Sequence, residues 1–297
     1  MENVNFSIGT DPELFCSLDD NLIAVQNCGI TGTKKDPQPL SNGGNAQRDN
    51  VAIEFGVPPT YNKEDFVNVI GLTLRDLQKA VPENVRLLPI PSAYFPEDQL
   101  TSEEAKQFGC DPDNNAWTLK ENKPPACAAE QTLRSCGGHI HLLFAALDNS
   151  MNKAIMIRIM DMIHGQIATY LDNSPEAIVR RQLYGKAGCY RETEYGGVEY
   201  RTLSNFWIKS PLLVELMYEL TADAIRVFKN NQYMELMEAE GGGQLIQQTI
   251  TEGMVDKAEH NMRNVLPKYL SDESKRLLDK AITAVGFNFE KEWGLAS

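Results

Sequence analysis

The stretch Arg134-Ser135-Cys136-Gly137-Gly138-His139-Ile140-His141-Leu142-Leu143-Phe144 predicts a buried strand over residues 140–144 that the chain enters through two glycines. Side chains of a strand alternate between its two faces, so His139 and His141 point to the same side. Glycines let another backbone, or a ligand, come close. Two imidazoles at the start of a strand, next to glycines that allow close approach, indicate a functional site. The alternative is a polar strand end with hydrogen-bonded histidines.

The composition is that of a globular protein with room for a sizeable core. The chain has 297 residues, of which 42% are apolar and 23% charged. No run approaches the roughly 20 apolar residues of a membrane helix, and the N-terminus lacks the features of a signal peptide. Six cysteines without a CxxC pair predict free thiols. We therefore expect a cytoplasmic protein with no membrane partner.

The formal net charge of −13 argues against nucleic-acid partners, because nucleic acids bind to cationic patches. It leaves room for a small anionic ligand bound by a few arginines.

Two further segments of strand periodicity carry carboxylates. Residues 4–18 predict a strand with a turn or bulge at 9–12, so that Asp11 and Glu13 share a face. Residues 49–57 alternate in the same way and place Asn50 and Glu54 together, on the face away from the core. The alternatives are an Asp-Pro turn with a solvated Glu13 and an exposed Glu54 on a solvated sheet.

The helical segments frame these strands. Asn62 predicts the N-cap of a helix, residues 149–171 a second long helix, and Ser210-Pro211 the start of a third. A short strand is expected over 85–90, and the tail after residue 231 reads as helical. We interpret the loop-like residues 92–130 as a lid-like insertion. The expected organisation is a catalytic region over 1–210 and a helical C-terminal part of the same domain over 211–297.

Cations and glycines gather in residues 180–191. Arg180, Arg181, Lys186 and Arg191 flank two glycines, a combination that suits phosphate oxygens or a carboxylate. A basic surface loop is the alternative. The next strand, entered through Gly196-Gly197, places Glu199 and Arg201 on one face, either in the site or as an ion pair on a solvated sheet.

If these strands lie in one antiparallel sheet, their carboxylates and imidazoles converge on one face. Carboxylates packed together repel and raise one another's pKa, and a divalent cation relieves the repulsion. Oxygen-rich ligation with an imidazole suits Mg²⁺ or Mn²⁺. With cations nearby, the site is typical of phosphoryl transfer on a nucleotide.

Five segments, taken in order, resemble the carboxylate–amine ligases of the glutamine synthetase and glutamate–cysteine ligase superfamily, and above all the phage-encoded carboxylate–amine ligase (amidoligase) group. They are Gly9 to Glu13, Asp49 to Phe55, Gly137 to His141, Arg180 to Arg191, and Glu199 to Arg201. The resemblance covers about residues 4–210. It implies an α+β fold, in which a curved, mainly antiparallel sheet forms a half-barrel funnel with helices outside. It also implies ATP with Mg²⁺ or Mn²⁺, an acyl phosphate intermediate, and attack by an amine to give an amide.

The resemblance assigns a role to each matching residue. Metal binding falls to Asp11, Glu13, Glu54, His139 and Glu199. Nucleotide or acyl-phosphate contacts fall to His141, Arg181, Lys186 and Arg191, with Arg180 beside them. Arg201 is the group that stabilises the transferring phosphoryl group, and Glu54 and Arg191 are counted with it as catalytic. Two departures stand out: Asp11 occupies the place of a glutamate in glutamine synthetase, and Asp49 would join Glu54 only if a bulge turned it inward.

Two other functions stay open. A metal-dependent hydrolase of amide or phosphate bonds would use the same acids and histidines, but it leaves residues 180–191 without a role unless its substrate is anionic. A binding or structural protein would need none of this chemistry. The sequence names neither the carboxylate nor the amine substrate, small molecule or peptide, and it leaves open whether the chain forms a homo-oligomer.

Overall fold

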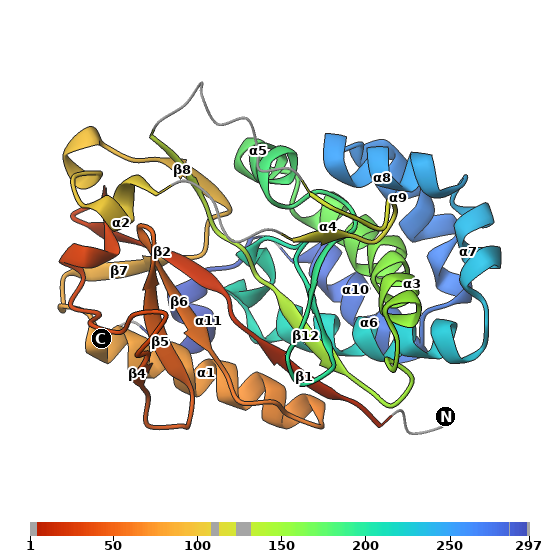
Figure 1. Cartoon of the computed structure of the whole chain (residues 1–297), viewed down its shortest axis with the longest axis horizontal. Coiled ribbons are helices and arrows are strands. Elements are labelled where there is room, and N and C mark those ends of the chain that lie inside the picture. The colour runs from red at the N-terminus through yellow and green to blue at the C-terminus, as the bar shows by residue number, and fades with distance from the viewer. Residues whose placement is uncertain (1–4, 108–112, 123–131, 285, 296–297) are drawn as a thin grey trace.

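The computed structural model describes residues 5–107, 113–122, 132–284 and 286–295. It combines curved antiparallel sheets with helices packed around them (Figure 1). Every strand pairing in these residues is antiparallel, so the predicted α+β class is confirmed. None of the helices in the described part is long and apolar enough to cross a membrane.

Two sheets carry the polar strands, and a third is a two-stranded ribbon. The first has the order β1 (Ser7–Thr10), β12 (Ile140–Leu143), β14 (Val198–Tyr200), β13 (Cys189–Glu192), β9 (Asn114–Asn115) and β10 (Lys120–Glu121). The second has the order β3 (Asn21–Ile23), β2 (Glu13–Leu18), β6 (Ala52–Gly56), β5 (Asn45–Asp49) and β4 (Gln38–Pro39), with β7 (Val85–Leu88) also paired to β2. The ribbon pairs β11 (Leu133–Ser135) with β8 (Ser92–Tyr94).

The two large sheets meet where the first strand is interrupted. β1 pairs with β12 in one sheet, and its continuation β2 pairs with β6 in the other. Asp11 and Pro12 lie between them, outside either strand. The amide of Glu13 donates to the carbonyl of Gly137 (3.0 Å), and the amide of Phe55 donates to that of Pro12 (3.1 Å). The predicted interruption is therefore present but covers only Asp11 and Pro12, because Gly9 and Thr10 still pair with β12, and it is the junction of the sheets.

The helices cover the sheets and fill the C-terminal part of the chain. They are α1 (Lys63–Ala80), α2 (Glu103–Lys106), α3 (Ser150–Met160), α4 (Gln166–Leu171), α5 (Pro175–Leu183), α6 (Pro211–Lys229), α7 (Tyr233–Ala239), α8 (Gly243–Glu252), α9 (Val255–Asn264), α10 (Asp272–Thr283) and α11 (Phe289–Trp293). A π-helical turn, Asp161–Gly165, joins α3 to α4, and short 3₁₀ turns cover Val25–Asn27, Glu97–Gln99, Asn205–Lys209 and Leu266–Lys268. Helix α6 contacts α1, α3 and α10.

The predicted helix starts are confirmed by their caps. The side chain of Asn62 accepts from the amide of Asp65, and that of Ser210 accepts from the amide of Leu213. Both caps satisfy amide groups that the first turn of a helix leaves without a partner. The predicted helix over 149–171 is present, with the π-helical turn in its middle.

The prediction of one strand over 49–57 is wrong at its start. The chain turns between β5 and β6 at Asn50, whose φ of 55° lies in the left-handed region that asparagine tolerates. Asn50 therefore does not lie beside Glu54 on the sheet. Within the predicted insertion over 92–130, the structure shows β8, α2, β9 and β10, while residues 108–112 and 123–130 lie outside the described part.

Candidate active site

A row of polar side chains crosses the first sheet. In the register of β1, β12, β14 and β13, Gly9 lies opposite His141, His141 opposite Glu199, and Glu199 opposite Arg191. Directly opposed residues of antiparallel strands present their side chains on the same face. The imidazole, the carboxylate and the guanidinium group thus lie side by side, and Gly9 leaves the end of the row open.

A second row crosses the other sheet. Glu13 of β2 lies opposite Glu54 of β6, which lies opposite Gln47 of β5. The amide of Gln47 donates to Oε1 of Glu54 (2.7 Å). Asp49, two residues further along β5, shares the face of Gln47. Glu13, Asp49 and Glu54 each offer an oxygen within 4.8 Å of the others.

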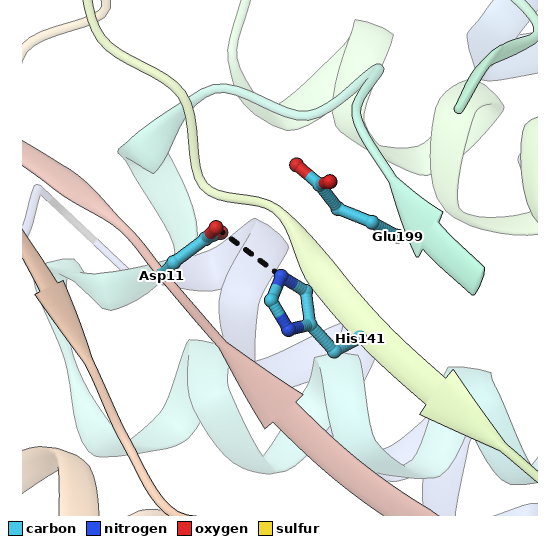
Figure 2. Close-up of side chains that lie close together, drawn as sticks. All are labelled: Asp11, His141 and Glu199. Atoms are coloured by element: carbon cyan, nitrogen blue, oxygen red, sulfur yellow. Dashed lines mark ion pairs between the residues drawn. The ribbon is translucent and has the colours of Figure 1, made fainter. Parts of the chain in front are cut away.

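Asp11 connects the rows from the junction between the sheets. Its Oδ2 lies 3.2 Å from Nε2 of His141, and its Oδ1 lies 3.1 Å from Nδ1 of His139. The same Nδ1 is 3.2 Å from Oε1 of Glu199. Figure 2 shows Asp11, His141 and Glu199 pointing toward one another, and their ligand atoms lie within 4.8 Å of each other. The structure therefore brings the five predicted metal residues together in two neighbouring groups. The first group is Asp11, His139, His141 and Glu199, and the second is Glu13, Asp49 and Glu54.

Burial and neighbouring charges shift the pKa values of these carboxyl groups, upward for Glu54 and Glu13 and downward for Asp11. Burial raises the pKa of Glu54 well above its ordinary value, and the charges of Asp11, Asp49 and Glu13 raise it further. Burial and Asp49 likewise raise the pKa of Glu13. Burial also acts to raise the pKa of Asp11, but His141 and His139 outweigh it, and the pKa lies below its ordinary range. Asp11 therefore loses its proton more readily than an ordinary aspartate, whereas Glu54 and Glu13 hold theirs more tightly than an ordinary glutamate.

These donors suit a divalent cation. Adjacent ligands of an octahedral Mg²⁺ site, each at 2.0–2.1 Å from the metal, are about 3 Å apart. Nδ1 of His139 lies 3.1 Å and 3.2 Å from the two carboxylates it faces. The raised pKa of Glu54 indicates a carboxylate cluster short of positive charge. Asp11, Glu199 and an imidazole thus suit one ion, and Glu13, Asp49 and Glu54 suit a second.

Two arginines border the first group. Nη1 of Arg201 donates to Oε1 of Glu199, and Nε of Arg201 lies 3.5 Å from Oδ2 of Asp113. Nη1 of Arg191 lies 4.0 Å from Oε2 of Glu199. Carboxylates on two sides thus hold the fork of Arg201 next to the histidines, and His139 is 3.5 Å from Nη1.

The other predicted cations are placed differently. Arg180 and Arg181 belong to helix α5 rather than to a loop. Arg180 is 2% exposed and donates to the carbonyls of Thr202 (2.9 Å) and Arg201 (3.3 Å), so it supports the strand that carries Arg201. Arg181 donates to the carbonyl of Ala168 (3.0 Å), at the end of α4. Lys186 is half-buried, and its carbonyl accepts from the hydroxyl of Thr202 (3.2 Å).

A pocket lies beside the two groups and is lined by members of both. It has a volume of about 50 Å³, and its polar lining includes Glu13, Asp49, His139, Arg134, Arg180 and Arg201. Acids and arginines thus both line it. A small anionic group could enter next to the carboxylates once cations neutralise them.

Several site residues escaped prediction from the sequence. Gln47 lies on β5, which was not predicted, and the same strand brings Asp49 to Glu54 without the bulge that the sequence-based prediction required. No motif marks Lys34 or Tyr195, which lie in turns. Nζ of Lys34 lies 3.0 Å from Oδ1 of Asp49. The hydroxyl of Tyr195 lies 3.3 Å from Nδ1 of His141. Asp113 belongs to the segment predicted as an insertion. No sequence signal marks these three.

Residues 126–265 match the model of a family described as Phage phiEco32-like COOH.NH2 ligase-type 2. This match confirms the resemblance to phage-type carboxylate–amine ligases. The matched residues of this chain include His139, His141, Arg191, Glu199 and Arg201, whereas Asp11, Glu13 and Glu54 precede them. No curated protein matches the sequence.

Two solved structures are similar to the chain over most of its length. A bifunctional glutathione synthetase from Pasteurella multocida is 11% identical with a TM-score of 0.42, and the match covers 98% of this chain and 51% of that chain. GmaS without ligand is 9% identical with a TM-score of 0.42, with coverage of 92% and 72%. The chain spans about half the length of the glutathione synthetase.

Proposed function

We propose that this protein is an ATP-dependent carboxylate–amine ligase that releases ADP. The observation that carries the proposal is that two clusters of carboxylates, two imidazoles and Arg201 converge at the junction of two sheets. The family match over residues 126–265 supports the ligase class. The substrates are a small-molecule or peptide carboxylate and an amine.

The cofactors in this proposal are ATP and two Mg²⁺ or Mn²⁺ ions. Asp11, Glu199 and one imidazole would hold one ion, and Glu13, Asp49 and Glu54 would hold the other. Bound divalent ions neutralise phosphate charge during phosphoryl transfer. Because the carboxylates are half-buried or buried and already lie close together, they are positioned in advance and lose little freedom on binding.

The residues of the chain then have distinct tasks. Arg201 is held by Glu199 and Asp113, so its guanidinium group is oriented before substrate arrives and donates to oxygens where negative charge develops. Arg191, on the neighbouring strand, adds a second cation at the same edge. Arg180 binds the carbonyls of Arg201 and Thr202 and keeps that strand in place. His141, Arg181 and Lys186 remain proposed contacts of the nucleotide, although Arg181 also binds the end of α4.

The proposed reaction has two steps. A carboxylate oxygen of the first substrate attacks the terminal phosphorus of ATP, the bond to the bridging oxygen breaks, and ADP leaves. The amine then attacks the carbonyl carbon of the acyl phosphate and loses a proton, and inorganic phosphate leaves with the amide formed. The pocket beside Arg180 and Arg201 would hold the reacting carboxylate.

The direct test is ADP release by the full-length protein with panels of carboxylates and amines. The proposal expects release that needs Mg²⁺ or Mn²⁺ and both substrates. Glu13→Gln should abolish it with the fold intact, whereas Glu83→Gln, an exposed acid before β7, should leave it unchanged. Hydrolysis of an amide or phosphate ester without ATP would show instead that the site belongs to a hydrolase.

A further inference from the structure

A buried carboxylate lies on the π-helical turn between α3 and α4. It belongs to Asp161, the first residue of that turn, which is 0% exposed. π-Helical turns are rare and are frequently found at functional sites. A buried carboxylate is costly unless hydrogen bonds satisfy its oxygens. The partners of Asp161 therefore indicate what this position does.

Both oxygens of Asp161 are contacted by side chains from distant segments. Oδ1 accepts from the hydroxyl of Tyr200 (2.8 Å), and the hydroxyl of Thr202 lies 3.2 Å from the same oxygen. These two residues stand on either side of Arg201 in the sequence. Oδ2 accepts from Nε1 of Trp117 (2.7 Å). One carboxylate thus binds the end of β14 and the hairpin formed by β9 and β10.

That hairpin also carries a partner of Arg201. Asp113 directly precedes β9, and its Oδ2 lies 3.5 Å from Nε of Arg201. The side chain of Asn115, in β9, accepts from the amide of Trp117 (2.9 Å), which ties the indole-bearing residue to the same strand. Asp161 therefore bridges the two segments between which the guanidinium group of Arg201 is held.

We infer that Asp161 is a positioning residue, which holds the end of β14 and the β9–β10 hairpin together so that Arg201 keeps its orientation between Glu199 and Asp113. It acts through other side chains and does not touch the reacting groups. Its part in the reaction rests on the proposed function, whereas its effect on the orientation of Arg201 does not. A carboxylate that served only the core would affect stability and leave Arg201 unchanged.

Replacement by the amide of the same shape separates these two roles. Burial raises the pKa of Asp161 to about 7, although the hydrogen bonds that it accepts act in the opposite direction. At pH 8 it is therefore ionised, and both of its oxygens accept. The amide in Asp161→Asn has a single accepting oxygen. Whichever way the amide faces, it loses the hydrogen bond from either the indole of Trp117 or the hydroxyl of Tyr200.

NMR of side-chain N–H groups at pH 8 tests the orientation of Arg201 in the ¹⁵N-labelled full-length protein. Arg201 is 5% exposed, which slows exchange of its Nε–H proton with water. The signal lost in Arg201→Lys identifies it. We expect Asp161→Asn to shift this signal and the indole signal of Trp117, one of three tryptophans. Trp117→Phe, which keeps a ring but removes the donor, should shift the Arg201 signal in the same direction.

A second buried carboxylate provides the matched control. Asp223 on α6 is also 0% exposed and accepts from the amide of Ser271 (3.2 Å). Asp223→Asn should lower the free energy of unfolding and shift neither signal. An unchanged Arg201 signal in both Asp161→Asn and Trp117→Phe, or an equal shift in Asp223→Asn, would overturn the inference.

ADP release tests the consequence for the reaction through a double-mutant cycle. Asp161→Asn should lower kcat by about ten- to a hundredfold and leave KM for ATP nearly unchanged. In the Arg201→Lys background the same change should have little further effect, because both act on one guanidinium group. Fully additive effects or an unchanged kcat would overturn the inference. If the wild type released no ADP with any substrate pair, the proposed function would fail, and the NMR result would still decide the role of Asp161.

Discussion

The group formed by Glu13, Asp49 and Glu54 should affect stability with opposite sign in the absence and presence of a divalent ion. The pKa of Glu54 lies well above its ordinary value of 4.5 because of burial and three neighbouring carboxylates. A raised pKa means that the folded state holds the proton more tightly than the unfolded state. The resulting stability is present below the ordinary pKa and is lost as the pH rises through the folded value. At neutral pH, Glu54→Gln should therefore stabilise the metal-free protein.

The magnitude follows from the spacing of the group. Two unit charges separated by 4.8 Å repel by about 3.5 kcal/mol at an effective dielectric constant of about 20. Protonation of Glu54 already relieves part of this, so we expect the variant to gain about 1–3 kcal/mol in unfolding free energy. An ion at a hundred times its Kd adds about 2.7 kcal/mol to the wild type. The variant loses a carboxylate ligand and should gain much less.

Urea unfolding at neutral pH, in EDTA and in saturating MgCl₂, measures both effects. The variant should be more stable than the wild type in EDTA, and the difference should shrink or reverse in MgCl₂. Glu83→Gln, which removes an exposed charge, should show neither effect. The reasoning is refuted if Glu54→Gln destabilises the protein in EDTA, or if it gains as much from Mg²⁺ as the wild type does.

Three further predictions address other parts of the site. Arg201→Lys keeps the charge but loses the planar fork that Glu199 and Asp113 hold, so ADP release should fall by about 10²–10³-fold with unchanged circular dichroism. Gln47→Ala removes the 2.7 Å hydrogen bond to Glu54 and should weaken Mn²⁺ binding about tenfold in calorimetry. Burial raises the pKa of Asp161 from 3.8 to about 7, so unfolding free energy should fall between those pH values with a slope of up to about 1.4 kcal/mol per unit, and Asp161→Asn should flatten that slope.

Local patterns in the sequence predicted the strands and helices that carry the site. Alternation placed His139 with His141 and Glu199 with Arg201, and in the structure both pairs lie at the cluster, with His139 directly before β12 and Arg201 directly after β14. Side-chain caps predicted the starts of α1 and α6. These features depend on residues within a few positions of each other, so the sequence suffices.

The glycine pair before His139 shows where local reasoning stopped. The sequence allowed either a ligand or another backbone to approach it. In the structure, a Cβ on Gly138 would lie 2.5 Å from the carbonyl oxygen of Ser204, and the amide of Gly137 donates to Oε2 of Glu13 (2.7 Å). The chain itself therefore occupies the space beside these glycines. Likewise, Arg180 and Arg181 read as an anion site, but their helix directs both toward backbone carbonyls.

The sequence by itself determined which residues share a strand face and that acids, histidines and arginines occur in the order typical of carboxylate–amine ligases. Only the tertiary structure decided that the polar rows belong to two sheets meeting at Asp11, that Asp49 and Gln47 complete the second group, and that Tyr195 reaches His141. The physical reason is one of range. Strand periodicity is fixed by neighbouring residues, whereas the register between strands and the path of a turn depend on packing between different segments, some of them as distant in the chain as β1 and β12.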